Sequence, residues 1–103
     1  MTDELKIESA TNRDGSATLT VVGEIDLASA PQFREALDQA ASSHSAIHID
    51  LRGVTYFDSS GVDALFTYAT KHRIDLAIGD NRTLAAIIKV TGLDHILALQ
   101  NGT

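Results

Sequence analysis

The spacing of apolar residues along this chain changes repeatedly, from every second residue to every third or fourth residue. This change limits the folds that the chain can adopt. Apolar and polar residues alternate, as in strands with one buried face, at 5–7, 17–22, 47–51 and 74–78. Apolar residues recur every three or four positions, as in amphipathic helices, at about 29–41, 59–73 and 81–92. The pattern therefore predicts strands and helices that alternate along the chain.

The order of the segments predicts the sheet topology. The turn sequence Asn12-Arg13-Asp14-Gly15 joins the first two strands into an antiparallel hairpin. Later strand–helix–strand units should form right-handed parallel crossovers, which makes the sheet mixed. Because the strands alternate instead of being continuously apolar, one sheet face should be wetter. We predict an α/β fold, order β-β-α-β-α-β-α-(β), with a single-layer mixed sheet and helices packed mainly on one face.

Several boundaries can be placed from capping residues. The candidate caps are Ser29 with Gln32 three residues on, Asp58 or Ser59, Asp80 or Asn81, and Gly92 as a C-terminal stop. Pro31 should lie in the first turn of the first helix, and the basic segment 71–73 should end the second. Residues 54–57 should extend the third strand irregularly. Residues 96–99 are either a closing strand or part of a helix over 93–99.

Composition narrows the class of protein. At 103 residues and 44% hydrophobic, the chain can bury one core, so residues 1–103 are predicted to form a single domain. The net charge of −6 disfavours direct contact with nucleic acid or anionic membranes and favours a basic protein partner. No apolar run approaches the length of a membrane span, and the N-terminus is acidic where a signal peptide is basic. We expect a cytoplasmic protein.

The segment Asp58-Ser59-Ser60-Gly61 lies where a predicted strand gives way to a helix. Two hydroxyls at a helix N-terminus would lie near backbone N–H groups and the positive end of the helix dipole, which favour an added anion. Ser60 is therefore a candidate phosphoacceptor. Simple capping of the helix by Asp58 or Ser59 is the alternative interpretation of the same pattern.

Three segments together resemble the STAS family of anti-sigma factor antagonists, over about residues 5–99. They are Gly23-Glu24-Ile25-Asp26 with Ser29, Ile49-Asp50-Leu51 through Val54 to Asp58-Ser59-Ser60-Gly61-Val62, and Thr91-Gly92-Leu93-Asp94. Each match alone would be weak, but all three occur at the separations typical of the family. The resemblance implies a single STAS domain with helices packed on a mixed sheet.

The resemblance also implies a function. The unmodified domain would bind an anti-sigma factor, itself an ATP-dependent serine kinase, and so free a sigma factor. The kinase would phosphorylate the second serine of the pair, Ser60 here, and a metal-dependent serine phosphatase would reset it. ATP and magnesium would belong to the partner, so we expect no cofactor, no metal and no enzyme activity in this chain, which should be a monomer when free.

The residues that the resemblance assigns to partner binding are Asp26, Asp58, Ser59, Gly61 and Val62. Asp26 would lie beside the serine loop and orient the serine or contact the kinase, unless it is only a turn residue. Gly61 would let a kinase surface approach closely, unless it is only a flexible first-turn residue. The chain's end at Thr103 leaves little room for the C-terminal helix of many family members, so we expect weaker or rearranged binding.

Two other functions compete with this one. The first is a stand-alone STAS subunit of a lipid-transport or sensory complex, against which the intact Asp-Ser-Ser-Gly segment argues. The second is a serine hydrolase, whose nucleophile elbow usually reads Gly-x-Ser-x-Gly and needs a coupled base, a pattern that this chain lacks. The spacing of His44 and His48 would suit a metal pair on a helix, but that stretch is predicted to be loop and strand.

Overall fold

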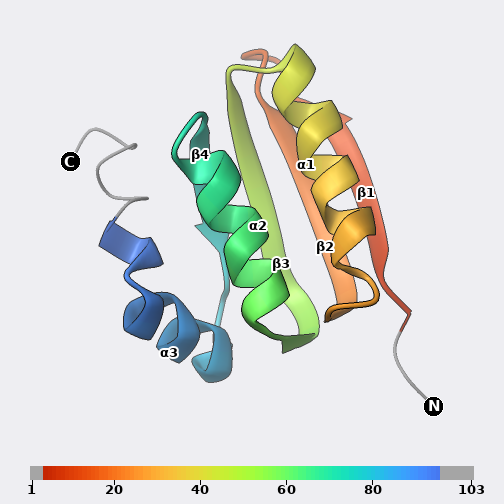
Figure 1. Cartoon of the computed structure of the whole chain (residues 1–103). Helices are drawn as coiled ribbons and strands as arrows, with labels where there is room; N and C mark the ends of the chain where they lie inside the picture. The colour runs from red at the N-terminus through yellow and green to blue at the C-terminus, as the bar shows by residue number, and fades with distance from the viewer. Residues whose placement is uncertain (1–3, 96–103) are drawn as a thin grey trace.

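Seven regular elements form in the order that the periodicities predict. The computed structural model describes residues 4–95. Its elements are β1 (Lys6–Thr11), β2 (Ala17–Ile25), α1 (Ala30–Ser43), β3 (Ala46–Phe57), α2 (Ser59–Ala69), β4 (Arg73–Ala77) and α3 (Arg82–Thr91) (Figure 1). Residues 93–95 are helical again, and the predicted closing strand at 96–99 lies outside the described residues.

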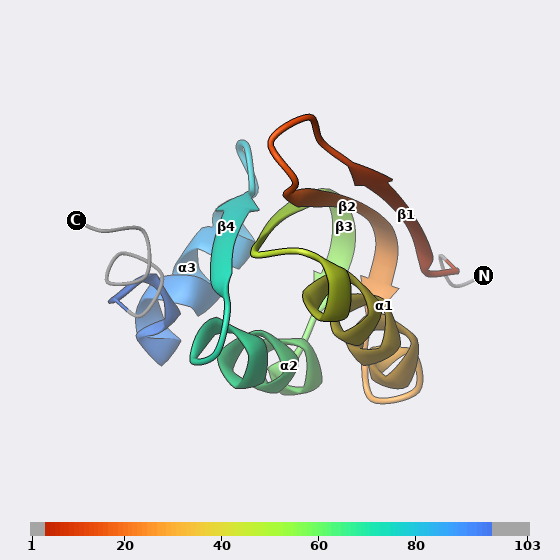
Figure 2. The same ribbon diagram turned by 90° about the horizontal axis from the view of Figure 1, so that it is seen from above.

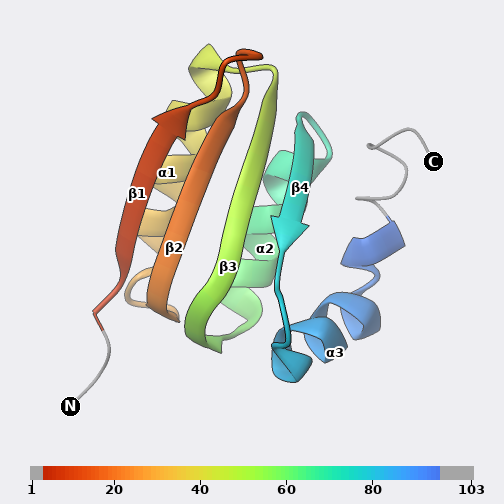
Figure 3. The same ribbon diagram turned by 180° about the vertical axis from the view of Figure 1, so that it is seen from behind.

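The four strands form one mixed sheet in the order β1-β2-β3-β4 (Figure 3). β1 and β2 pair antiparallel across the predicted turn, in which Gly15 has a φ of 86°. β2 with β3 and β3 with β4 pair parallel, as the crossover argument predicts. The predicted single-layer mixed sheet is thereby confirmed. None of the helices in residues 4–95 combines the length and the apolar character that crossing a membrane requires.

Helices cover one face of the sheet. Viewed from above, α1 and α2 lie side by side on the same side of the strands, and α3 lies beyond β4 at the sheet edge (Figure 2). The core lies between these layers, and its largest fully buried side chains are Phe33, Leu19, Ile25, Leu37, Ile47, Ile49, Leu51, Leu65, Ile74, Leu84, Leu93 and Val21. The other sheet face carries polar pairs, His48 with Asp75 and Arg52 with Asp50. The predicted division into a covered and a wetter face is confirmed.

The predicted side-chain cap of α1 is wrong. Ser29 occupies the N-cap position, but its hydroxyl donates to the Glu24 carbonyl at 2.8 Å and accepts from the Asp26 N–H at 3.0 Å. The Gln32 side chain donates to the Leu5 carbonyl at 3.2 Å instead of closing a capping box. Both side chains therefore connect the start of α1 to neighbouring chain segments. Pro31 lies in the first turn, as predicted.

The other helix boundaries agree better with those predicted from the sequence. Asp58, not Ser59, caps α2 by accepting from the Ser60 N–H, and Asn81, not Asp80, caps α3 by accepting from the Leu84 N–H. Gly92 ends α3 in the left-handed conformation. α2 ends at Ala69, before the basic segment 71–73 that was expected to end it, because Arg73 already belongs to β4.

Close packing at the β3–α2 junction fixes the start of α2. Gly61 is buried, and a Cβ atom on it would lie 2.6 Å from Cε2 of Phe57, 2.8 Å from Cζ of the same ring and 3.0 Å from Cγ2 of Ile25. Real Cβ atoms are not found so close to another heavy atom, so any side chain at this position must displace the ring. The first turn of α2 therefore packs directly on the ends of β2 and β3.

We predict that Gly61→Ala destabilises the domain by about 1–3 kcal/mol, because the added methyl group overpacks the contact with Phe57. Helix propensity alone would favour alanine by about 1 kcal/mol, so the sign of the change distinguishes the two effects. Urea unfolding measures it. In a Phe57→Leu background, where the clashing ring is gone, the same substitution should cost clearly less. An equal cost in both backgrounds would show that the ring is not responsible.

Candidate functional site

Two loops that lie far apart in the sequence meet at one end of the sheet. The β2–α1 and β3–α2 loops both follow the carboxyl ends of parallel strands, where open α/β sheets place their binding sites (Figure 1). The Asp58 N–H donates to the Ile25 carbonyl at 3.2 Å, which joins the loops directly. Two of the segments singled out in the sequence, 23–26 and 58–61, are therefore neighbours in the fold.

The two serines at the start of α2 have free hydroxyl groups. Within residues 4–95, the hydroxyl of neither Ser59 nor Ser60 forms a hydrogen bond with another residue. Ser59 is exposed and Ser60 is half-buried. Both hydroxyls are therefore free of contacts with the described residues, and Ser59 is the more exposed of the two.

The backbone N–H groups at this helix start are less available than the sequence predicts. The Asp58 carboxylate accepts from the Ser60 N–H at 2.9 Å, and the Asp58 carbonyl accepts from the Gly61 N–H at 3.1 Å. The expectation that free N–H groups here would favour an anion is therefore wrong for these two groups, because Asp58 occupies both. An added anion would also meet the carboxylate of Asp58.

A groove of about 600 Å³ runs between the starts of α1 and α2 beside the serines. Its lining residues are Leu27, Ala30, Pro31, Arg34, Ser59, Ser60, Val62, Asp63 and Phe66. Leu27 is 80% exposed, which is unusual for a large apolar side chain and marks a candidate contact with another protein. The Arg34 guanidinium lies 2.7 Å from the Asp63 carboxylate and connects the two helices. The groove thus combines apolar side chains with two hydroxyls and one ion pair.

Asp26 lies next to the serine loop but its carboxylate does not line the groove. It accepts from the Ser29 N–H at 2.9 Å, and this bond is the main reason why the pKa of Asp26 is below its ordinary value. The side chain lines a separate hollow with Glu24 and Ser29, among others. These contacts match the turn-residue alternative, and binding of a partner by Asp26 stays a prediction.

The remaining predicted contacts differ in exposure. Gly61 is buried against Phe57 and Ile25, so the idea that its missing side chain admits a partner is not supported, and the core explains the glycine instead. Val62 is only 8% exposed yet lines the groove, so it serves the core and the groove edge.

Sequence reasoning missed six groove residues: Leu27, Ala30, Pro31, Arg34, Asp63 and Phe66. Leu27 could have been noticed in the sequence, because it is apolar, directly follows the Asp26 turn and fits neither the strand pattern nor the helix pattern that would bury it. Phe66 follows Val62 by four positions and so shares its helix face. The ion pair between Arg34 and Asp63 had no signal, because the two residues are 29 positions apart on different helices.

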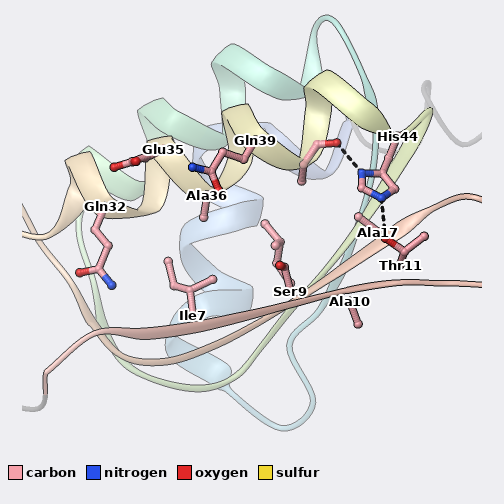
Figure 4. Close-up of a pocket in the computed structure, with 12 residues that line it drawn as sticks. Ile7, Ser9, Ala10, Thr11, Ala17, Gln32, Glu35, Ala36, Gln39 and His44 are labelled. Atoms are coloured by element: carbon pink, nitrogen blue, oxygen red, sulfur yellow. Dashed lines mark hydrogen bonds between the residues drawn. The ribbon is translucent and has the colours of Figure 1, made fainter.

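The serines have no metal cluster beside them in residues 4–95, and two of the histidines make contacts elsewhere in the fold. No group of three or more His, Cys, Asp or Glu side chains there could hold a metal ion. His44 lies in a separate cleft of about 320 Å³ between β1 and α1, with Nδ1 2.8 Å from the Ala40 carbonyl and Nε2 2.9 Å from Oγ1 of Thr11 (Figure 4). His48 pairs with Asp75 on the uncovered sheet face. Both histidines are thus engaged away from Ser60.

Comparison with known proteins agrees with this geometry. Residues 9–99 match the family model described as "Mlab, STAS domain". The chain is 31% identical over 86 residues to the anti-sigma-B factor antagonist of Listeria monocytogenes, a match that covers 79% of this chain and 75% of that protein. An antagonist acts by binding another protein, so this is a family of non-enzymatic regulators, and the prediction that the chain is not an enzyme is confirmed.

Solved structures show the same fold. The crystal structure of an anti-sigma factor antagonist from Mycobacterium paratuberculosis is 30% identical, with a TM-score of 0.76 over 90% of this chain and 82% of that chain. The phosphorylated form of the Bacillus cell fate determinant SpoIIAA is 19% identical, with a TM-score of 0.66 over 86% of each chain, and its likeness shows the fold alone. The chain therefore belongs to the STAS domain family of anti-sigma factor antagonists.

Proposed function

We propose that the unmodified chain binds an anti-sigma factor serine kinase and so releases a sigma factor, and that phosphorylation of Ser60 switches this binding off. The observation that carries the proposal is the position of Ser60, with a free hydroxyl, on a partly apolar groove at the junction of the two loops. The related proteins are antagonists of anti-sigma factors, and this supports an anti-sigma factor as the class of partner.

The groove has the composition of a protein-binding surface. Exposed Leu27 lines the groove together with Pro31 and Phe66, which offer apolar surface for a partner side chain. The net charge of −6 would attract a basic surface and speed the encounter. The partner's side of the reaction needs ATP and magnesium, and a serine phosphatase would remove the phosphate again.

Phosphorylation would oppose binding through charge. The phosphate adds about −1.5 to −2 charges at neutral pH, next to the carboxylate of Asp58 and on the same helix as Asp63. At a docked surface this charge must be desolvated, and where it meets an acidic group within an otherwise basic partner surface, the juxtaposition of like charges costs several kcal/mol. Since about 1.4 kcal/mol is a tenfold change in affinity, a loss of two orders of magnitude is expected.

The choice of Ser60 over Ser59 rests on its position in the Asp-Ser-Ser-Gly segment and not on access. Ser59 is the more exposed of the two, so access alone would favour modification there. Both side chains line the groove, and a phosphate on either would change its charge. The two serines therefore need to be separated by experiment.

We predict that Ser60→Ala folds, binds the kinase persistently and takes up no phosphate, whereas Ser60→Asp folds but binds at least tenfold more weakly. Ser59→Ala, the matched control, should still be phosphorylated. The test incubates each variant with the purified kinase and ATP, maps the modified residue by mass spectrometry and measures affinity by calorimetric titration.

Phosphate found on Ser59, or equal affinity of the Ser60→Asp and unsubstituted proteins, would contradict the assignment. Two results together would instead support the alternative of a stand-alone STAS subunit. They are an affinity that no substitution of Ser59 or Ser60 changes, and co-purification of a lipid-transport or sensory complex from the native host.

A further inference from the structure

A phosphate on Ser60 needs a positively charged or hydrogen-bonding neighbour, and the start of α2 supplies few. The N–H groups of Ser60 and Gly61 already donate to the carboxylate and the carbonyl of Asp58. The carboxylate of Asp58 repels a second anion at the same place. The helix N-terminus by itself therefore does not account for where such a phosphate would be held.

Arg34 on α1 is the only basic residue among the described residues that line the groove. Its Nη2 atom lies 2.7 Å from Oδ2 of Asp63 on α2. Ser60 and Asp63 are three positions apart on α2, which places their Cβ atoms about 5–6 Å apart on one helix face. A guanidinium that contacts Asp63 from the neighbouring helix therefore lies within about one helical turn of Ser60, and both residues line the same groove.

The present partner of Arg34 holds it weakly. The ion pair has one short nitrogen–oxygen contact, and its side chains are 39% exposed for Arg34 and 71% exposed for Asp63. Exposed pairs of this kind contribute little to stability. A phosphate carries nearly twice the charge of a carboxylate and offers three acceptor oxygens, and the planar guanidinium binds two of them in parallel. Phosphoserine should therefore compete successfully with Asp63.

We propose that Arg34 is the positioning residue for phosphorylated Ser60, and that it leaves Asp63 to bind the phosphate. The proposal deepens the proposed function and rests on it, since it presupposes modification of Ser60. The phosphate is then held across the groove between α1 and α2, and the Asp63 carboxylate is left on the groove wall without its cation. Both changes act against a partner side chain that would otherwise enter beside Leu27.

The contact can be measured without any kinase by incorporating phosphoserine at position 60 during translation. Titration followed by ³¹P NMR gives the second pKa of the phosphate. A nearby guanidinium stabilises the dianion, so this pKa should lie about 1 unit lower in the otherwise unsubstituted protein than in Arg34→Gln, the low end of the shift that an adjacent opposite charge produces. Arg34→Lys, which keeps the charge but not the planar fork, should give an intermediate value.

Arg52→Gln is the matched control, because Arg52 also pairs with an aspartate but lies on the uncovered sheet face. It removes the same net charge and should leave the phosphoserine pKa unchanged. A pKa that is the same in the unsubstituted, Arg34→Gln and Arg52→Gln proteins would overturn the proposal, and so would a shift of equal size in both glutamine variants. If Arg34→Gln does not fold, the same comparison is made with Arg34→Lys. Failure of a kinase to modify Ser60 would overturn the proposed function while leaving this measurement intact.

Discussion

The parallel pairing of β2 with β3 is the constraint on which the site depends. It places the carboxyl ends of both strands at one end of the sheet, and the hydrogen bond from the Asp58 N–H to the Ile25 carbonyl extends the pairing beyond the last residues of the strands. Gly61 then lets the first turn of α2 lie against Phe57 and Ile25. The serine pair is thereby held on a rigid junction and not on a free loop, which fixes its distance from α1.

The local spacing of apolar residues was sufficient to predict the architecture, because each element has one buried and one exposed side. The alternation of Ile47, Ile49 and Leu51 with polar residues gave β3, and Asp58 could be named as a cap candidate from its place before the helix. What local pattern could not supply is the set of contacts made between distant segments. Ser29 and Gln32 fit a capping box by spacing, yet their side chains bond to Glu24 and Leu5.

The same limit applies to the site. Ser60 stood out in the sequence because its neighbours form a motif, whereas Arg34 and Asp63 acquire meaning only when α1 and α2 pack side by side. Gly61 was singled out for the wrong reason, since its space is filled by this chain's own Phe57 ring. Register shifts between Thr20 and Val22 and between Gly23 and Glu24 bring Ile25 opposite Phe57, so that β2 and β3 end together at the site.

We infer that a partner kinase docks on the groove beside Ser60 and not elsewhere on the domain. NMR shift mapping of the isotope-labelled chain, titrated with an unlabelled anti-sigma factor serine kinase, tests this most directly. We expect the perturbed amides to cluster at residues 27–34 and 59–66, while those of the uncovered sheet face, such as His48 and Arg52, stay unchanged. Perturbations centred on the uncovered sheet face or on the β1–α1 cleft, with the groove unaffected, would contradict it.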